Sequence, residues 1–238
     1  KYSEVAQKFS EAKENYKKIL PAPAFLEIKP VELNFGTSGL RDLVKNMTDI
    51  ECYINTRGFI EYLIATEDIQ RGAIIYVAGD YRPATPRIMR AVAKAIEDSG
   101  CKAVNCGVIP TPAVSYYGLI HRSASIMVTG SHIPIDRNGI KFYKSTGEVL
   151  KPDEPGILAY VAKIRNEEYA KTEVNTLFNK KGMFRKIWPL GPVEQKAKEA
   201  FVSRYLKVFP EDCLKGKTIV VYQHSAAARD ILVKILQG

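Results

Sequence analysis

The sequence has little of what zinc-binding, disulfide-linked and membrane-spanning proteins require. Its four cysteines form no Cys-x-x-Cys pair; they are Cys52, Cys101, Cys106 and Cys213. This spacing favours free thiols in a reducing compartment over a zinc site or a disulfide framework. The sequence also contains no apolar run long enough to span a bilayer and no signal-peptide pattern. We therefore expect a cytoplasmic protein without a membrane partner.

The charge of the chain indicates a protein that handles small anions. The chain has 238 residues, of which 35 are Lys or Arg and 26 are Asp or Glu, so the formal net charge is +9. Neither an RNP-type aromatic motif nor a helix-turn-helix pattern accompanies this charge, and the basic residues form no compact arm. A site for anions such as sugar phosphates is therefore a better interpretation than nucleic-acid binding.

The hydrophobic pattern predicts alternating strands and helices. Strands are expected at 31–35, 73–78, 101–106, 126–128, 140–143 and 217–222, and helices at 1–20, 48–63, 86–99, 113–122, 153–170, 193–208 and 228–236. Strands separated by helices of this length indicate βαβ units, so we predict a mixed, largely parallel α/β sheet flanked by helices. Ligands of such sheets gather at the carboxyl ends of the strands.

The order of these segments predicts four parts of the chain. Residues 1–30 form an N-terminal helix and linker, 31–170 a first α/β domain and 171–192 a linker that packs across it. Residues 193–238 contain a strand and a helix with nothing after them, which we interpret as the truncated start of a second α/β domain. The sequence contains nothing that specifies an oligomeric state.

One stretch, residues 124–143, has the pattern strand, polar loop, turn, strand. The loop Thr129-Gly130-Ser131-His132 follows a short apolar run, and Asn138-Gly139 is a turn signal before the next strand. Ser131 would lie at the end of a strand, where its hydroxyl can meet a ligand. On composition alone, an ordinary surface loop is the simpler interpretation.

Two further polar segments follow predicted strands. Residues 36–42, Gly-Thr-Ser-Gly-Leu-Arg-Asp, predict a glycine-hinged loop in which Thr37 and Ser38 can bond phosphate oxygens and Arg41 can bind them bidentately. Asp80 and Arg82 follow the strand 73–78, and we interpret them as an ion pair that braces their loop. The three loops, at Gly36, Asp80 and Ser131, are expected to share one edge of the sheet.

These motifs resemble those of the α-D-phosphohexomutases, over residues 33–156 and more weakly near 220–228. Residues 129–134 and 138–141 resemble the phosphoserine loop, with Gly130 and Ile133 in place of the commoner Ala and Asn. Residues 36–41 resemble the first active-site loop, where Asp42 replaces the usual following Gly. Asp80 and Arg82 match the end of the Gly-x-Asp-x-Arg pattern.

The resemblance implies a mutase that interconverts hexose 6-phosphate and hexose 1-phosphate. Phosphorylated Ser131 would transfer its phosphoryl group to a hexose phosphate through a 1,6-bisphosphate. It implies that Lys141 acts as general acid/base or charge stabiliser, that Arg41 stabilises phosphate and that His132 orients the serine loop. Thr37, Ser38 and Arg41 would contact substrate or phosphate.

The resemblance also implies a magnesium cofactor. The family's triple-aspartate metal loop is absent from this chain, which leaves the phosphoryl oxygen on Ser131 as its one metal ligand. We therefore expect the chain alone to lack full mutase activity. Two alternatives remain. One is a non-catalytic sugar-phosphate-binding module. The other is a serine hydrolase using Ser131, although residues 129–133 are not Gly-x-Ser-x-Gly. The sequence does not specify the preferred hexose.

Overall fold

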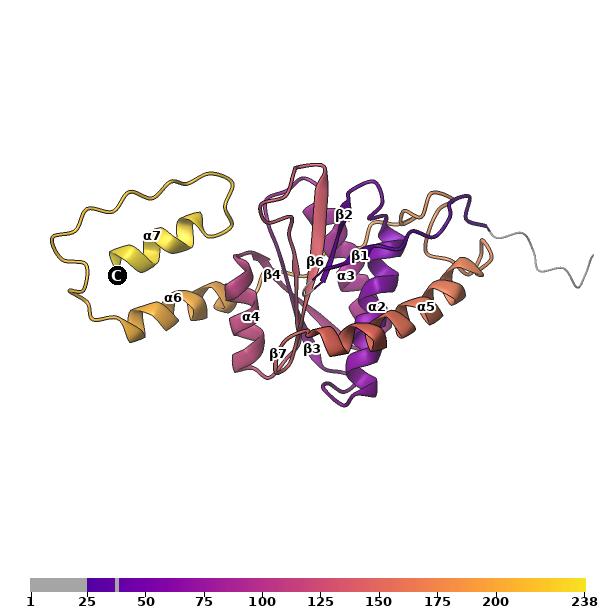
Figure 1. Cartoon of the computed structure of the whole chain (residues 1–238), viewed down its shortest axis with the longest axis horizontal. Helices are drawn as coiled ribbons and strands as arrows, with labels where there is room; N and C mark the ends of the chain where they lie inside the picture. Colours follow the sequence, from indigo (N-terminus) through magenta and orange to yellow (C-terminus); the bar gives the residue numbers. More distant parts are fainter. Residues whose placement is uncertain (1–24, 37–38) are drawn as a thin grey trace, which may run out of the picture.

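The computed structural model describes residues 25–36 and 39–238 and contains a sheet of seven strands between helices (Figure 1). The strands are β1 (Asn34–Phe35), β2 (Gly39–Leu43), β3 (Ile74–Gly79), β4 (Lys102–Val108), β5 (Ser125–Val128), β6 (Arg137–Lys144) and β7 (Gly147–Glu148). The helices are α2 (Asp49–Ala65), α3 (Thr85–Asp98), α4 (Thr111–Ile120), a 3-10 turn η1 (Lys151–Asp153), α5 (Glu154–Tyr169), α6 (Lys196–Val208) and α7 (Arg229–Gln237). The helix predicted at 1–20 lies outside the described residues.

The sheet is mixed and flanked by helices, as predicted. Its strand order is β1-β2-β6-β5-β3-β4, with β7 paired to β6. The strands β4, β3 and β5 are parallel, whereas β5, β6, β2 and β1 pair antiparallel in succession. The parallel part is thus confined to three strands. Only residues 129–136 join β5 to β6, and a connection this short, without a crossover helix, returns the chain antiparallel.

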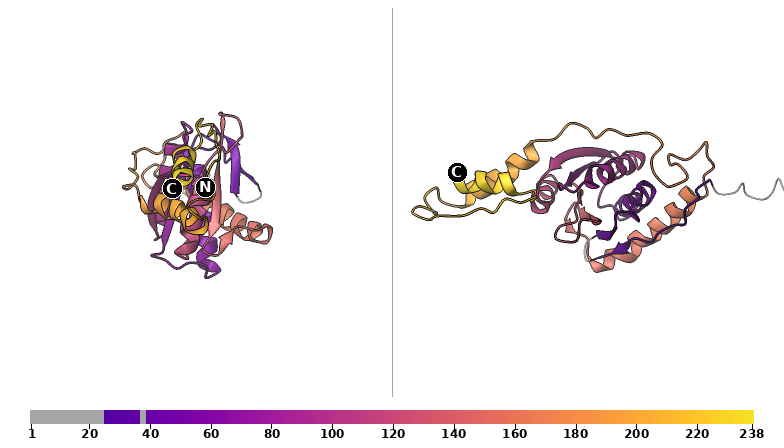
Figure 2. Two further views of the ribbon diagram at one scale, coloured as in Figure 1. Left: turned by 90° about the vertical axis from the view of Figure 1, so that its left-hand side faces the viewer. Right: turned by 90° about the horizontal axis from the view of Figure 1, so that it is seen from above.

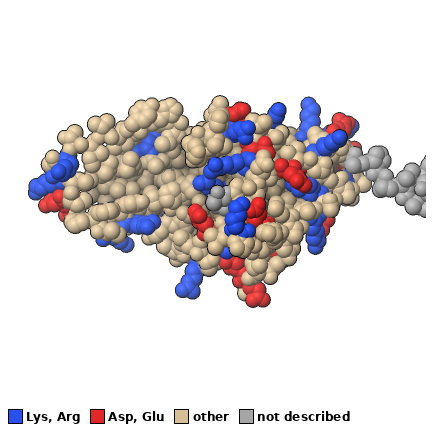
Figure 3. Space-filling model, in the orientation of Figure 1, with Lys and Arg blue, Asp and Glu red and all other residues tan. Residues whose placement is uncertain are grey.

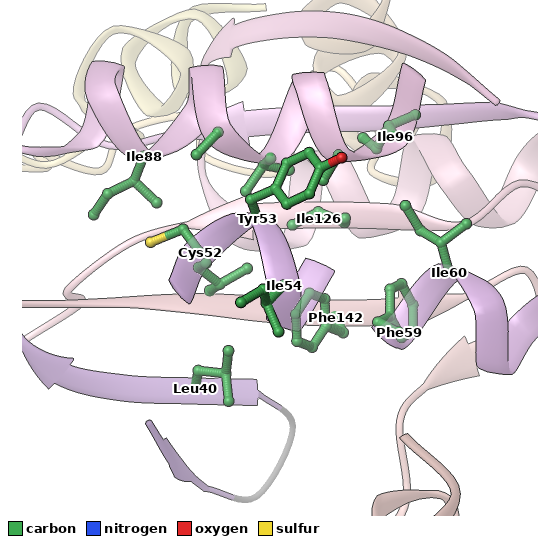
Figure 4. Close-up of a cluster of buried hydrophobic side chains, with 14 of the residues drawn as sticks. Leu40, Cys52, Tyr53, Ile54, Phe59, Ile60, Ile88, Ile96, Ile126 and Phe142 are labelled. Atoms are coloured by element: carbon green, nitrogen blue, oxygen red, sulfur yellow. The ribbon is translucent and has the colours of Figure 1, made fainter. Parts of the chain in front are cut away.

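Two apolar layers cover the two faces of the sheet. The larger layer packs α2, α3 and α5 on one face, and the smaller one packs α4, α6 and α7 on the other. In the larger layer the ring of Phe59 in α2 stacks on that of Phe142 in β6, with centroids 4.5 Å apart (Figure 4). Figure 2 shows α6 and α7 together beyond α4, at one end of an elongated molecule.

The helix starts follow local sequence signals. Thr48 is the N-cap of α2, and its hydroxyl accepts a hydrogen bond from the Glu51 amide. Proline occupies the first turn of α3 and of α4, where its missing N–H leaves no helical bond unmade. The predicted helix boundaries are therefore within about three residues of those observed, the usual uncertainty of helix ends.

Three local predictions near the site are wrong. Only Asn34–Phe35 of the predicted strand 31–35 is a strand, and residues 39–42 of the predicted loop 36–42 belong to β2, which continues to Leu43. Asn138 and Gly139 are not a turn but lie inside β6, opposite Asp42 and Arg41. The ladders of β6 with both β5 and β2 override the local preference of Asn-Gly for a turn. The chain turns instead at residues 135–136.

The strand predicted at 217–222 is also wrong. These residues have no strand structure, and Val220 is 90% exposed and Tyr222 85% exposed. A strand is stable only beside a hydrogen-bonded neighbour, and no strand in the described part of the chain lies next to this segment. The division into parts at residues 30, 170 and 192 remains a prediction.

The segment 171–192 makes hydrogen bonds to earlier parts of the chain. The Glu27 amide donates to the carbonyl of Lys180, and the Ile50 amide donates to that of Gly182. Further along, the side-chain amide of Asn105 in β4 donates to the carbonyl of Gly191 at 2.9 Å. Two backbone hydrogen bonds therefore join this connection to the segment before β1 and to the start of α2, and one side-chain hydrogen bond joins it to β4.

Candidate active site

The loop after β5 holds Ser131 in a strained conformation at the surface. Ser131 has a φ of +52°, in the left-handed region that non-glycine residues rarely adopt. Its amide donates to the hydroxyl of Thr129 at 2.9 Å, and its own Oγ lies 3.2 Å from Nδ1 of His132. Ser131 and His132 are both exposed. A strained, exposed hydroxyl at a strand end is a common arrangement at functional sites.

The carboxylate of Asp80 fastens this loop to the end of β3. Its Oδ2 accepts hydrogen bonds from the Thr129 hydroxyl at 2.8 Å and from the Gly130 amide at 3.0 Å. Its Oδ1 accepts from the Thr85 hydroxyl at 2.6 Å and from the Arg82 amide at 3.0 Å. Four donors thus satisfy one carboxylate. The expectation that the Asp80 and Ser131 loops share one edge of the sheet is confirmed.

Arg82 also binds the loop. Its Nε lies 3.5 Å from Oδ2 of Asp80, which confirms the predicted ion pair. Its guanidinium also donates hydrogen bonds to four backbone carbonyls, those of Ser131, Ile133, Pro134 and Arg137. The planar guanidinium of arginine carries five N–H donors, enough to bond all four carbonyls. Lysine has three donors on one nitrogen and cannot make this set of bonds.

The register of β2 and β6 brings two cations to the same face of the sheet. Arg41 lies opposite Gly139, and Lys141 is the second residue after Gly139 along β6. Cross-strand partners and alternate residues share a face, so Arg41 and Lys141 are diagonal neighbours. Among the described residues, neither forms an ion pair. Figure 3 shows Lys and Arg side chains gathered over the region of β2 and β6.

Gly139 connects these cations to the serine loop. Its carbonyl accepts the Thr129 amide at 3.0 Å, and a Cβ at this glycine would come within 2.6 Å of the Leu40 carbonyl. The absence of a side chain lets β2, β6 and the loop after β5 approach closely. The structure thus places Ser131, Arg41 and Lys141 on adjoining segments. Thr37 and Ser38 lie outside the described residues.

Sequence reasoning missed three supporting residues. Thr85 and Thr129 bond Asp80, and the buried Asn138 donates through Nδ2 to Oγ1 of Thr85 at 3.0 Å. In the sequence they belong to a helix start, a loop and a turn signal, each of which has an ordinary local explanation. Their common role requires three segments to meet, and spacing along the chain does not reveal that.

The cysteines do not contribute to this site. The described thiols are all free, with Cys52, Cys101 and Cys106 buried and Cys213 exposed. Burial raises the pKa of Cys52 to about 12 and, likewise, that of Cys106 to about 12. A thiol of such a high pKa is protonated at neutral pH and is a poor nucleophile or metal ligand. The expectation of free thiols is therefore confirmed.

Among the described residues there is neither a cluster of metal ligands nor a membrane-spanning helix. No group of three or more His, Cys, Asp or Glu side chains among them is arranged to hold a metal ion. None of the helices in the described ranges has both the length and the apolarity that crossing a membrane requires.

Comparison with known proteins places the chain in a family. The family model for phosphoglucomutase/phosphomannomutase, alpha/beta/alpha domain I, matches residues 32–168. The chain belongs to this family, the α-D-phosphohexomutases, as its sequence motifs predicted. The matched range begins just before β1 and ends in α5, so it contains the whole sheet and the Ser131 loop.

Among individual relatives, the chain is similar to two curated phosphomannomutases. It is 36% identical to that of Sinorhizobium fredii over 204 residues, which cover 86% of this chain and 40% of the relative. It is 35% identical to that of Salmonella muenchen over 199 residues, covering 84% and 37%. The chain thus spans less than half the length of these relatives.

A solved structure supports the fold. A crystal structure from Thermus thermophilus, named as that of a candidate phosphomannomutase, superimposes with a TM-score of 0.68 at 20% identity. The match covers 88% of this chain and 44% of that one. At this identity the likeness establishes the mixed α/β fold alone.

Proposed function

We propose that this chain is the N-terminal portion of a phosphohexomutase that transfers phosphoryl groups through Ser131. One observation supports this more than any other. Ser131 is exposed and backbone-strained at the end of β5, beside the strands that carry Arg41 and Lys141. The whole mutase reaction is a proposal for the full-length protein, since the chain spans about 40% of its curated relatives.

In the proposed reaction, phosphorylated Ser131 donates to the free hydroxyl of a hexose monophosphate. The bond between Ser131 Oγ and phosphorus breaks, and a bond from the sugar oxygen to phosphorus forms. The sugar hydroxyl gives up its proton and Ser131 Oγ takes one up, so that a free serine hydroxyl remains. The product is a hexose 1,6-bisphosphate. The bisphosphate then reverses its orientation in the site, and its other phosphoryl group is transferred to Ser131. This second transfer restores the phosphoenzyme. Phosphoryl transfer depends on positioning and on stabilisation of negative charge.

Arg41 and Lys141 are the groups proposed to supply that stabilisation. A guanidinium binds phosphate oxygens in pairs, and an ammonium acts as a compact point charge. Lys141 also has a proton to exchange, so the roles of charge stabiliser and general acid/base both remain for it. His132 would orient the Ser131 hydroxyl, from which its Nδ1 is 3.2 Å away. Thr37 and Ser38 are proposed to contact phosphate or substrate.

The described residues do not by themselves fit a magnesium site. Asp80 is the carboxylate bonded to the serine loop, and its two oxygens already accept four hydrogen bonds and pair with Arg82. A magnesium ion prefers near-octahedral oxygen coordination, which this engaged carboxylate does not offer. Of this chain, only the phosphoryl group on Ser131 is proposed as a magnesium ligand.

The hydrolase alternative receives no support from the geometry. Ser131 and His132 are adjacent, but no carboxylate within the described ranges is bonded to His132 to orient it as a base. A non-catalytic sugar-phosphate-binding module uses the same cations without transfer. The mutase and the binding module differ in whether Ser131 becomes phosphorylated.

Transfer from a labelled donor tests the proposal. The chain is incubated with hexose 1,6-bisphosphate that carries radioactive phosphate, and the protein-bound label is counted. We expect the wild type to take up label, Ser123→Ala to match it and Ser131→Ala to take up none. Equal labelling of Ser131→Ala would contradict the proposal. Robust mutase turnover by the isolated chain would contradict the expectation that it lacks full activity.

A further inference from the structure

The Arg82 guanidinium bonds the backbone of the Ser131 loop at several points. Arg82 bonds the carbonyls of residues 131, 133, 134 and 137, which span the whole connection from the strained serine to the start of β6. Oδ2 of Asp80 accepts the Gly130 amide and also pairs with Arg82. The Arg82 guanidinium therefore binds the carbonyls of the loop, and the Asp80 carboxylate binds the Gly130 amide. Arg82 and Asp80 also form an ion pair with each other.

Position 130 is shaped to fit this arginine. A Cβ on Gly130 would lie 2.1 Å from Nε of Arg82 and 2.3 Å from its Cζ. Such distances are far inside van der Waals contact, and the guanidinium cannot swing aside without breaking its bonds to the loop. Alanine at position 130 would therefore displace the Arg82 guanidinium from its present place.

We infer that Arg82 is the positioning residue that sets the conformation of the Ser131 loop, and that its placement requires glycine at position 130. The left-handed φ of Ser131 costs energy and persists only where surrounding contacts fix it. Here Arg82 bonds the Ser131 carbonyl, Asp80 bonds the neighbouring Gly130 amide, and the Thr129 hydroxyl, itself bonded to Asp80, accepts the Ser131 amide. The consequence for phosphoryl transfer by Ser131 rests on the proposed function, whereas the loop geometry itself does not.

Amide hydrogen exchange tests the loop geometry without reference to activity. Arg82→Lys keeps the charge and loses the planar fork, so we expect the Gly130 and Ser131 amides to exchange about tenfold faster or more, the effect of losing one charge-assisted hydrogen bond. Arg87→Lys is the matched control, because Arg87 also joins a carboxylate, Asp49, to a backbone carbonyl, but at α2. It should leave both loop amides unchanged. Unchanged exchange in Arg82→Lys would overturn the inference.

A double-mutant comparison tests the pairing of residues 82 and 130. Gly130→Ala is expected to speed exchange at Ser131 as Arg82→Ala does, because the new methyl group displaces the guanidinium. In Arg82→Ala the space is empty, so adding Gly130→Ala should change little more. The two effects would then be strongly non-additive, as for residues in contact. Additive effects, or a Gly130→Ala protein with fully protected loop amides, would overturn the inference.

Labelling from hexose 1,6-bisphosphate separates the two claims. If the wild type is labelled, we expect the initial labelling rate to fall about tenfold or more in Arg82→Lys and to stay constant in Arg87→Lys. An unaffected rate in Arg82→Lys would refute Arg82 as a positioning residue. If the wild type takes no label, the proposed function fails, and the exchange measurements still decide whether Arg82 sets the loop.

Discussion

Asp80 and Thr129 are 49 residues apart in the sequence and are joined by a hydrogen bond of 2.8 Å at the ends of β3 and β5. These strands are parallel neighbours, so their carboxyl ends lie at the same edge of the sheet. The bond fixes the loop that carries Ser131 to the end of a neighbouring buried strand. The conformation of the site therefore depends on this carboxylate.

Removing that carboxylate should destabilise the whole protein. Asp80→Ala removes the counter-ion of a largely buried guanidinium and the acceptor of two hydroxyls and two backbone amides, those of Gly130 and Arg82. We expect the free energy of unfolding to fall by about 3 kcal/mol, measured by urea denaturation. Asp212→Ala is the control, because the Asp212 side chain, which pairs with Lys215, is 79% exposed, and it should change stability by less than about 0.5 kcal/mol. Equal effects of the two substitutions would contradict the structural account.

Lys141 can be assigned to one of its two proposed roles. Lys141→Ala should slow the labelling of Ser131 by about 100-fold or more, the usual effect of removing a group that stabilises transferring charge. Lys141→Arg keeps a positive charge that does not deprotonate. A rate near wild type in Lys141→Arg would indicate charge stabilisation, and a rate as low as that of Lys141→Ala would indicate proton transfer.

The control for Lys141 is another strand lysine. Lys102 is exposed and lies in the edge strand β4, which β5 and β3 separate from β6. Lys102→Ala should leave the labelling rate unchanged. If both lysine substitutions reduce labelling equally, only the net charge of the protein matters, and Lys141 has no specific role.

The close contact of α2 and α5 makes Gly58 sensitive to added volume. A Cβ at Gly58 would come within 2.3 Å of Cγ2 and 2.8 Å of the backbone nitrogen of Val161. Alanine favours helix by about 1 kcal/mol over glycine, yet we expect Gly58→Ala to lower stability by about 1–3 kcal/mol, because overpacking forces the helices apart. Gly191→Ala, with no atom within 4 Å of the new methyl group, should be neutral. A stabilised Gly58→Ala protein would disprove the contact.

Asp153 makes the stability depend on pH in acid. Burial alone would raise the pKa of Asp153, but hydrogen bonds from Lys144, the Leu150 amide and Tyr62 outweigh it and hold the pKa below its ordinary value of 3.8. A lowered folded-state pKa means that the ionised carboxylate stabilises the fold above the unfolded-state pKa. This contribution is lost as the pH falls through the folded-state value.

The variant Asp153→Asn isolates that contribution. It should unfold at lower urea concentration than wild type at pH 7, and the difference should shrink as the pH is lowered from about 4 to 2. Asp212→Asn, at an exposed ion pair, should show little difference from wild type at either pH. A gap between Asp153→Asn and wild type that stays constant with pH would contradict the lowered pKa.

The sequence predicted the helices and the buried strands well because their signals are local. The apolar stripe of α3, the prolines in the first turns and the run at 126–128 each fix an element without help from distant residues. Asn138 and Gly139 were misread because two neighbouring strands, not local preference, determine their conformation. The segment 217–222 has the composition of a strand, but composition provides no partner.

The main residues of the candidate site were predicted from a motif, but the residues that position the Ser131 loop were not. Ser131, Arg41 and Lys141 are identified by resemblance, and β2 and β6 place the two cations side by side. The left-handed φ of Ser131 and the fit of Arg82 against Gly130 have no counterpart in the sequence pattern. Both arise only where the ends of β3 and β5 and the start of β6 meet.

The most direct test of the central claim is the intact mass of the protein after exposure to hexose 1,6-bisphosphate, before and after phosphatase treatment, with tandem mass spectrometry to locate the modification. The account predicts the added mass of one phosphoryl group, located on Ser131, removed by phosphatase and absent from Ser131→Ala. A phosphoryl group on any other residue, or a wild-type mass that never changes, would contradict it.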